Sequence, residues 1–239
     1  MVAREDGCIA GLGVALRVFE LVDDGIATGA LVQDGDIVTA GTRLASVNGP
    51  ARGILAAERL ALNLLGQLSG VATATRALVD RVEGTGARII DTRKTVPLLR
   101  ALQKQAVVAG GGANHRMGLY DQVLIKDNHV EAVGSEAEAV RRARAAVGPD
   151  VKVEVEIESL DVLEDVIEAG ADIVMLDNMA PESMRQAVER AAGRVVLEAS
   201  SGITLATVRA VAASGVDVIS AGWITHSAPS LDVALDFEG

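Results

Sequence analysis

The chain has 239 residues, enough for one large domain or for one domain with a smaller companion. Its formal net charge of −11 argues against nucleic acid and anionic membranes as partners. Its single cysteine excludes an intrachain disulfide and a cysteine-rich zinc site, and no apolar run reaches the roughly 18 to 20 residues of a membrane span. The N-terminus lacks the basic-then-apolar form of a signal peptide, so we expect a soluble, cytoplasmic protein.

Turn signals punctuate residues 1–52 and predict short strands and turns of a small antiparallel sheet. From Ile54 to about Glu83, leucines recur at intervals of three or four residues, which predicts one long helix. Small residues in this helix would allow another helix or a backbone segment to approach closely. They are Gly66, Ser69, Gly70 and Ala72.

Short apolar runs alternate with amphipathic helical patterns after Gly86. Ser135 and Glu138 form a capping box at the start of one helix, and Pro181 opens a later one. Such alternation predicts a parallel sheet, and six or seven units of this length favour a barrel, complete or open, over a doubly wound sheet. No G-x-G-x-x-G motif follows the first strand. The predicted strands are 87–90, 122–125, 151–157, 171–176, 194–199 and 216–221.

The segment from Asp91 to Asn128 is net basic inside an acidic chain. A local excess of cations indicates a bound anion rather than a nucleic-acid surface, which would need a broad positive stripe. A solvated helix face would account for Arg100 and Lys104 better than for the other cations. The six basic side chains are Arg93, Lys94, Arg100, Lys104, Arg116 and Lys126.

Polar or small residues follow each predicted strand, and in a barrel these strand ends converge on one mouth. Glu154, Glu156 and Glu158 alternate along one strand and therefore share a face. A solvated acidic edge would account for Glu154 and Glu158, and less well for Glu156. Glu156 and Asp177 would hold Mg²⁺ through waters and substrate oxygens.

The last two strand-end loops, Ser200 to Gly202 and Ala221 to Gly222, consist of small residues. Barrels commonly bind phosphate with the backbone amides of these loops. Arg93, His115 and Arg116 would hold a second anion, since the planar guanidinium suits a carboxylate. The sequence therefore predicts a phosphorylated, Mg²⁺-associated substrate beside a second anionic substrate.

Several motifs make this prediction specific: DTRKT, GGGANHRMGLYD, LIKDNH, VEVEIESL, LDN, EASSGI and GWITHSAPSLD. Together they closely resemble the quinolinate phosphoribosyltransferase family, in order from about Val2 to Phe237. The resemblance implies an α/β fold with a small N-terminal α/β sandwich domain, residues 1–70, which lacks its opening elements. A C-terminal open β/α barrel, residues 71–239, would follow, and the last residues could return to the first domain. The family forms dimers or assemblies of dimers.

The family transfers phosphoribose from phosphoribosyl pyrophosphate to quinolinate and releases pyrophosphate and carbon dioxide. The product is nicotinate mononucleotide, an intermediate of NAD synthesis. The pattern implies that Arg93, His115 and Arg116 bind the quinolinate carboxylates, next to Thr92. Arg59 would reach into the partner subunit's site.

The resemblance implies catalytic roles for Lys94, Lys126, Glu156 and Asp177. The two lysines would contact phosphoribosyl pyrophosphate or a substrate carboxylate, and the two carboxylates would face the ribose hydroxyls and Mg²⁺. A cradle for the 5′-phosphate would complete the site, with His226 nearby. Its residues are Ser200, Ser201, Gly202, Ala221, Gly222 and Trp223.

Departures from the family pattern concern the phosphate loop most. The family usually has Ser-Gly-Gly where this chain has Ser200 to Gly202, and Ser201 would be strained if its position requires a positive φ. Trp223 stands where a small residue is usual, and Gln105 and Val108 replace a common tyrosine and a basic residue. The alternatives are a paralogous pyrophosphorylase with another acceptor, a catalytically impaired phosphate-binding homologue, or a generic phosphate-binding barrel, which would not explain the arginines.

Overall fold

The computed structural model describes residues 1–237, and the chain divides into two compact units. The first unit contains Met1–Val79, Lys94–Ala113 and the chain from Gly222 onward, and the second contains Asp80–Arg93 and Asn114–Ala221. Each unit is therefore assembled from segments that are distant in sequence. The domain boundary expected at residue 70 stays a prediction.

The first unit contains three pairs of short antiparallel strands, and two of them lie within residues 1–52, where the turn signals predict antiparallel strands. One pair joins the two ends of the chain, since Val2 is opposite Ala234. Its helices are α1 (Leu12–Val22), most of α2 (Ala51–Val82), α3 (Arg100–Ala109) and α9 (Trp223–His226). The strand pairs are β1 (Val2–Ala3) with β12 (Val233–Ala234), β2 (Gly7–Cys8) with β4 (Ile37–Val38), and β3 (Ala27–Ala30) with β5 (Ala45–Asn48).

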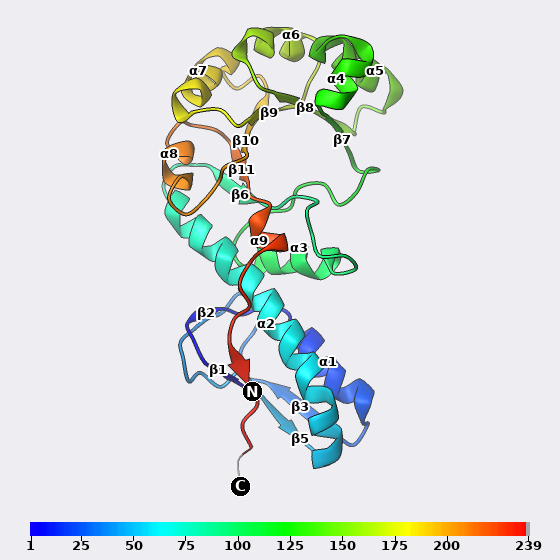
Figure 1. The fold of residues 1–239 in the computed structure, drawn as a ribbon, viewed down its shortest axis with the longest axis vertical. Coiled ribbons are helices and arrows are strands. Elements are labelled where there is room, and N and C mark those ends of the chain that lie inside the picture. The colour runs from blue at the N-terminus through cyan, green and yellow to red at the C-terminus, as the bar shows by residue number, and fades with distance from the viewer. Residues whose placement is uncertain (238–239) are drawn as a thin grey trace. The chain divides into compact units, whose positions relative to one another are not determined.

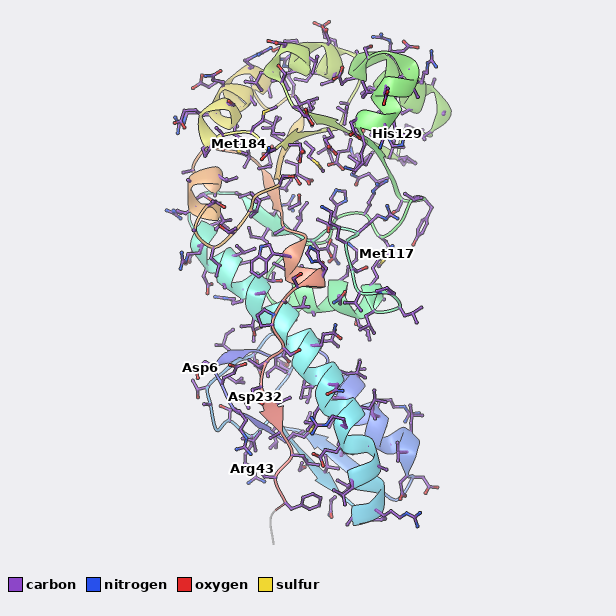
Figure 2. All side chains as sticks on the ribbon, viewed as in Figure 1. Asp6, Arg43, Met117, His129, Met184 and Asp232 are labelled. Carbon is purple, nitrogen blue, oxygen red and sulfur yellow. The ribbon has the colours of Figure 1, made fainter. Side chains whose placement is uncertain are left out.

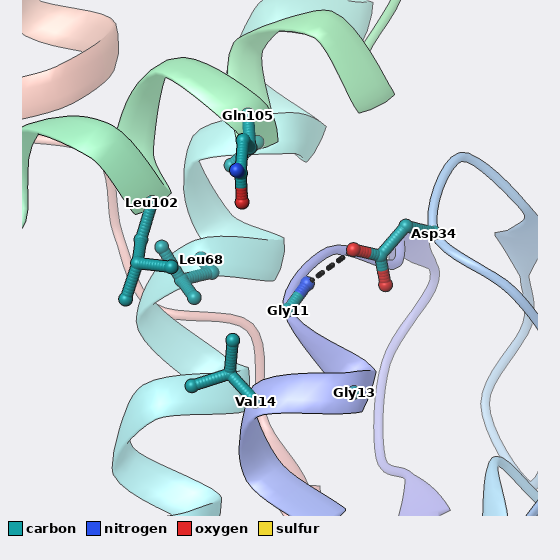
Figure 3. A pocket seen from close by; sticks show the side chains of 8 residues that line it. Gly11, Gly13, Val14, Asp34, Leu68, Leu102 and Gln105 are labelled. Atoms are coloured by element: carbon teal, nitrogen blue, oxygen red, sulfur yellow. Dashed lines mark hydrogen bonds between the residues drawn. The ribbon is translucent and has the colours of Figure 1, made fainter.

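Helix α1 contradicts the prediction that residues 1–52 are all strands and turns. It begins after Gly11, whose φ of 78° is left-handed and whose side chain cannot cap the helix. The Asp34 carboxylate caps it instead, accepting the N–H of Gly11 at 2.8 Å and that of Leu12 at 3.1 Å. Figure 3 shows this cap beside a pocket of about 260 Å³ that α1, α2 and α3 line. The helix was missed because its cap comes from a residue more than twenty positions away in sequence.

Helix α2 confirms the predicted long helix, and its small residues receive the closing segment of the chain. A Cβ atom added at Gly70 would lie 2.0 Å from the Pro229 carbonyl oxygen, and one added at Gly66 would lie 2.8 Å from that of Leu231. The Leu231 N–H also donates to the Gly66 carbonyl at 2.9 Å. Glycine is therefore required at both positions for this close backbone approach.

Helix α3 buries Lys104, which is only 1% exposed. The prediction of a solvated helix face is therefore wrong for Lys104. Three other residues of α3, Gln103, Ala106 and Val107, are buried with it, so position 104 belongs to the packed face of the helix.

The second unit contains a six-stranded parallel sheet in the order β6-β11-β10-β9-β8-β7. No pairing joins β6 to β7 among residues 1–237, so the barrel is open, as expected. Figure 1 shows the strands following an arc with α4 to α8 on its outer side. The strands are β6 (Arg88–Ile90), β7 (Gln122–Ile125), β8 (Lys152–Ile157), β9 (Ile173–Asp177), β10 (Val196–Ser200) and β11 (Val218–Ser220).

The helices of the second unit follow the predicted punctuation. Ser135 caps α5 by accepting the Glu138 N–H at 3.3 Å, and Pro181 is the first residue of α7. Their apolar residues pack inward; Met184 of α7 is 1% exposed (Figure 2). The helices are α4 (Asp127–Val133), α5 (Glu136–Ala146), α6 (Leu163–Glu168), which a short 3₁₀ turn precedes, α7 (Pro181–Ala191) and α8 (Val208–Ala212).

Strand β8 shows how the sheet separates its two faces. Val153, Val155 and Ile157 are buried at alternate positions, which places them on the helix-covered side. Glu154 and Glu156 therefore face the inside of the arc. Glu154 has no exposed surface, and β8 lies between β7 and β9, so the prediction of a solvated acidic edge is wrong for Glu154.

Candidate active site

Four residues on the inner face of β7 and β8 and in the loop before β7 form a closed ring of contacts. The Arg116 backbone N–H donates to His115 Nδ1 at 2.7 Å, and His115 Nε2 lies 3.2 Å from Glu154 Oε2. The Gln122 side chain donates to the same Glu154 oxygen at 2.6 Å, and its backbone carbonyl accepts Arg116 Nη1 at 3.0 Å. Asp91, at the end of β6, holds the loop by accepting the His115 N–H at 2.7 Å.

Glu198 of β10 lies beside this ring and is almost fully buried. One of its carboxylate oxygens is 3.8 Å from His115 Nε2. Burial raises the pKa of Glu198 to about 8, and the charge of Glu154 acts in the same direction. A raised pKa favours the protonated form of Glu198, in which it can donate a hydrogen bond to Glu154.

Two opposing effects act on the pKa of His115, which is buried beside two carboxyl groups. Burial lowers the pKa of His115, but the hydrogen bond to Glu154 and the charges of Glu154 and Glu198 outweigh it and raise the pKa. Its side chain is only 7% exposed. His115, Glu154 and Glu198 are thus three ionisable groups that water barely reaches, and we call them the inner wall of the site.

Arg93 and Arg116 supply positive charge next to this wall. Burial lowers the pKa of Arg116, and the nearby charge of Arg93 lowers it further. Two guanidinium groups close enough to repel each other are stabilised by an anion placed between them. Among residues 1–237, Arg116 makes one side-chain hydrogen bond, through Nη1, so Nε and Nη2 are available to a ligand.

Carboxylates stand at the ends of β8 and β9, as the sequence predicts. Glu156 forms an ion pair with Lys126, which precedes α4, and the Glu156 side chain is 13% exposed. His129 of α4 (Figure 2) fixes the Lys126 backbone, because its Nδ1 accepts the Lys126 N–H at 2.9 Å. Asp177, the last residue of β9, accepts the Ser201 hydroxyl at 2.6 Å.

The Ser200–Gly202 loop has the strained conformation that was expected. Ser201 has a φ of 67°, which costs a non-glycine residue free energy, and Gly202 has a φ of 68°. The Ser200 carbonyl accepts the Asn178 N–H at 3.2 Å, and the Ser220 hydroxyl donates to that of Ser200 at 3.1 Å. These bonds hold the loop against the neighbouring strand ends and leave the backbone of Gly202 exposed.

The remaining predicted site residues are divided between the units. Thr92 and Ala221 belong to the second unit, and the Ala221 N–H donates to the Ile90 carbonyl at 3.1 Å. Five belong to the first unit, where the Lys94 carbonyl accepts the Thr225 hydroxyl at 2.7 Å. These five are Arg59 on α2, Lys94, Gly222, Trp223 and His226.

Sequence reasoning did not name Glu198 or Gln122 as site residues, and for Glu154 it left a solvated acidic edge as an alternative to the barrel interior. A usable signal was present, because Glu154 and Glu198 each lie between apolar residues of their strands. A charged residue inside a buried strand requires a partner, so such positions mark polar networks.

Both parts of the chain match models of one protein family. Residues 1–69 match the quinolinate phosphoribosyl transferase N-terminal domain, and residues 71–236 match its C-terminal domain. The nicotinate-nucleotide pyrophosphorylase of Mycobacterium leprae is 48% identical over 241 residues, covering 99% of this chain and 84% of that protein.

Solved structures give the same result. The nicotinate-nucleotide pyrophosphorylase of Francisella tularensis superposes with a TM-score of 0.93 at 42% identity, over 97% of this chain and 82% of that one. The enzyme of the same name from Ehrlichia chaffeensis gives 0.94 at 36% identity, over 99% and 86%. Within residues 1–237, none of the helices combines the length and apolar character that crossing a membrane requires. The chain belongs to the quinolinate phosphoribosyltransferase family.

Proposed function

We propose that this chain transfers phosphoribose from phosphoribosyl pyrophosphate to quinolinate, releasing pyrophosphate and carbon dioxide and forming nicotinate mononucleotide. The observation that carries the proposal is the pairing of Arg93 and Arg116 beside a buried acidic wall, with carboxylates at the neighbouring strand ends. The arginines suit a dicarboxylate, and the strand-end carboxylates suit a sugar that becomes cationic.

Quinolinate carries two adjacent carboxylates on a pyridine ring, and each needs a cationic partner in a site that excludes water. Nε and Nη2 of Arg116 offer the planar fork that a carboxylate accepts. Arg93, with Thr92 before it, would hold the other carboxylate from the end of β6. A ring held in this way presents its nitrogen in one direction, which converts the encounter with the sugar into an oriented attack.

Phosphoribosyl pyrophosphate would occupy the ends of β8, β9 and β10. The backbone of Ser200, Ser201 and Gly202, with Ala221, Gly222 and Trp223, would cradle its 5′-phosphate, and His226 would lie nearby. The small, exposed residues Ser201 and Gly202 suit this role. Lys94 and Lys126 would balance the charge of the pyrophosphate or of a carboxylate. Lys126 would then exchange its ion pair with Glu156 for a substrate contact.

Mg²⁺ suits Glu156 and Asp177, because both offer carboxylate oxygens at adjacent strand ends and neither is fully buried. Each uses one oxygen for Lys126 or Ser201, so the other oxygen remains for the ion or for a ribose hydroxyl. When bound, the ion would neutralise charge on the departing pyrophosphate. The chain's own contribution is to orient the sugar.

The reaction balances without an oxidant. The pyridine nitrogen forms a bond to the anomeric carbon while the bond to pyrophosphate breaks. The carboxylate next to that nitrogen leaves as carbon dioxide, and the electron pair left on the ring carbon takes up a proton. Arg93 and Arg116 would stabilise this negative charge, as would the cationic ring nitrogen.

Arg59 would serve the site of a second copy of the chain in a homodimer or an assembly of dimers. It lies on α2 and is exposed, which leaves its guanidinium available to a partner. We also propose that the protein is cytoplasmic. Mixing an Arg59→Ala variant with an Arg116→Ala variant tests the arrangement, because hybrid dimers would regain one intact site and some activity.

Mass spectrometry of the products tests the proposed reaction. Nicotinate mononucleotide should form from phosphoribosyl pyrophosphate and Mg²⁺ with quinolinate and not with nicotinate. Product from nicotinate alone would assign a different acceptor. A folded protein that binds phosphoribosyl pyrophosphate without forming product from either compound would be the impaired homologue instead.

A further inference from the structure

The closed ring of His115, Arg116, Gln122 and Glu154 constrains Arg116 at two points. His115 Nδ1 accepts its backbone N–H, and the Gln122 carbonyl accepts its guanidinium. His115 and Gln122 are themselves connected, because both contact Glu154 Oε2, at 3.2 and 2.6 Å. Arg116 is therefore held in place through Glu154, although Glu154 lies on the inner wall of the sheet.

The hydrogen-bond directions assign the protons of His115. A backbone N–H can only donate, so His115 Nδ1 must be an unprotonated acceptor in this conformation. The ring proton is consequently on Nε2 and points to Glu154. Both ring nitrogens are occupied by protein groups, and the side chain is 7% exposed, so little of the ring is available to a substrate.

Glu198 completes the network from the other side. Glu154 Oε1 and Glu198 Oε1 are buried and make no hydrogen bond within residues 1–237. Glu198 Oε2 is 3.8 Å from His115 Nε2, the ring nitrogen that also lies 3.2 Å from Glu154 Oε2. Glu198 therefore bounds the Nε2 side of the His115 ring together with Glu154.

We propose that His115, Gln122, Glu154 and Glu198 are positioning residues that hold Arg116 for the substrate carboxylate, and that His115 does not itself contact the substrate. This inference rests on the proposed function for the identity of the anion. It revises the role that the family resemblance implies for His115, and it assigns roles to three residues that the sequence did not identify.

Nitrogen NMR of the histidine rings tests the network independently of any activity. The chain has three histidines, so a His115→Asn variant assigns the resonances of His115 directly. We expect the neutral ring to carry its proton on Nε2 and not on Nδ1. A neutral ring with its proton on Nδ1 would overturn the proposal, even for a chain that acts on another acceptor.

A double-mutant cycle distinguishes positioning from contact. Calorimetry would measure the quinolinate dissociation constant for His115→Ala, Arg116→Lys and the double variant, with thermal unfolding as the check on folding. We expect His115→Ala to weaken binding about tenfold in the native background and less than twofold when Arg116 is already lysine. Equal effects in the two backgrounds would show that His115 contacts the substrate.

Conservative replacements sharpen the result. The Asn carbonyl can replace Nδ1 as the acceptor of the Arg116 N–H, so His115→Asn should retain binding within about threefold of the native protein. Glu198→Gln, which keeps the donor of a protonated acid, should also bind quinolinate normally.

Because His115, Glu154 and Glu198 place ligand atoms within 4.8 Å of one another, metal content must be measured too. One tightly held Zn²⁺ or Mn²⁺ per chain would overturn the proposal, because these three side chains would then be metal ligands.

Discussion

Glu154 and Glu156 lie two residues apart on the same face of β8, yet their surroundings differ completely. Glu154 is fully buried among neutral donors, while Glu156 is partly exposed and paired with Lys126. The inner carboxylate is held by the side chains of His115 and Gln122, and the outer one can exchange its lysine for a ligand. One strand thus supplies both a rigid wall and a reactive edge, separated by less than 7 Å of extended chain.

This contrast explains where chemistry is located in the second unit. At the strand ends, each carboxylate keeps an accessible oxygen, which substrate binding requires. In the wall, burial makes every unpaired charge costly, so hydrogen bonds fix the orientation of the side chains. Mutations at the edge should change activity more than stability, and mutations in the wall should do the reverse.

The largest effect is expected at Arg116, where the wall meets the edge. Arg116→Ala should lower kcat/KM for quinolinate by on the order of 100- to 1,000-fold, because a charged hydrogen-bond pair with the substrate is lost. Steady-state kinetics with each substrate would measure it. Arg141→Ala is the matched control, since Arg141 is an exposed arginine that pairs with Glu138. Activity of Arg116→Ala equal to that of the control would remove the carboxylate assignment.

The next largest effect is expected for Asp177→Asn, which should lower kcat/KM for phosphoribosyl pyrophosphate by about 10- to 100-fold. Asparagine can still accept the Ser201 hydroxyl, so the loop is preserved while the charge is removed. The Mg²⁺ concentration that gives half of the maximal rate should rise as well. Glu158→Gln serves as the control, because Glu158 is exposed beyond the end of β8. An unchanged Mg²⁺ dependence would argue against Asp177 as a ligand.

Glu198 gives the wall a dependence of stability on pH. Its pKa is raised from 4.5 to about 8 in the folded chain, so between these values the folded state binds more protons than the unfolded state. Stability therefore falls as pH rises through this window, by at most about 1.4 kcal/mol per pH unit for one group. Glu198→Gln should flatten this part of the profile in urea unfolding experiments.

Glu198→Ala is the contrasting variant for this site. It should lose about 2 to 3 kcal/mol of stability at pH 6, where the native carboxyl is protonated and packed. If Glu198→Gln and the native protein show parallel stability profiles between pH 5 and 8, the raised pKa is not a property of Glu198.

The smallest effect is expected at Ser201. Ser201→Gly removes the strain of a φ of 67° but also the hydroxyl bond to Asp177, so its free energy of unfolding should stay within about 1 kcal/mol of the native value. Ser201→Ala loses the same bond and keeps the strain, so it should be less stable than Ser201→Gly by about 1 kcal/mol. Thermal unfolding of both variants would measure the difference. The reverse order of stability would show that the serine is not strained.

Much of the fold was predictable because its signals are local. The run QVLI predicts β7 to the residue, and Ser135 and Pro181 mark the starts of α5 and α7. The other barrel strands are displaced from the predicted runs by up to two residues, since propensity does not define where a hydrogen-bonded ladder ends.

What could not be predicted depends on contacts between distant residues. The cap of α1 comes from Asp34, so the sequence next to the helix carries no N-cap signal. The burial of Lys104 and Glu154 depends on what the fold places against them, which periodicity alone does not reveal. The motifs nevertheless indicated both arginines and both strand-end carboxylates, because their spacing follows the strands.

The most direct test of the central claim uses quinolinate labelled with ¹³C in the carboxylate next to the ring nitrogen. With phosphoribosyl pyrophosphate and Mg²⁺, we expect one labelled carbon dioxide and one pyrophosphate for each nicotinate mononucleotide formed. Pyrophosphate release without labelled carbon dioxide would contradict a decarboxylating transfer at this site.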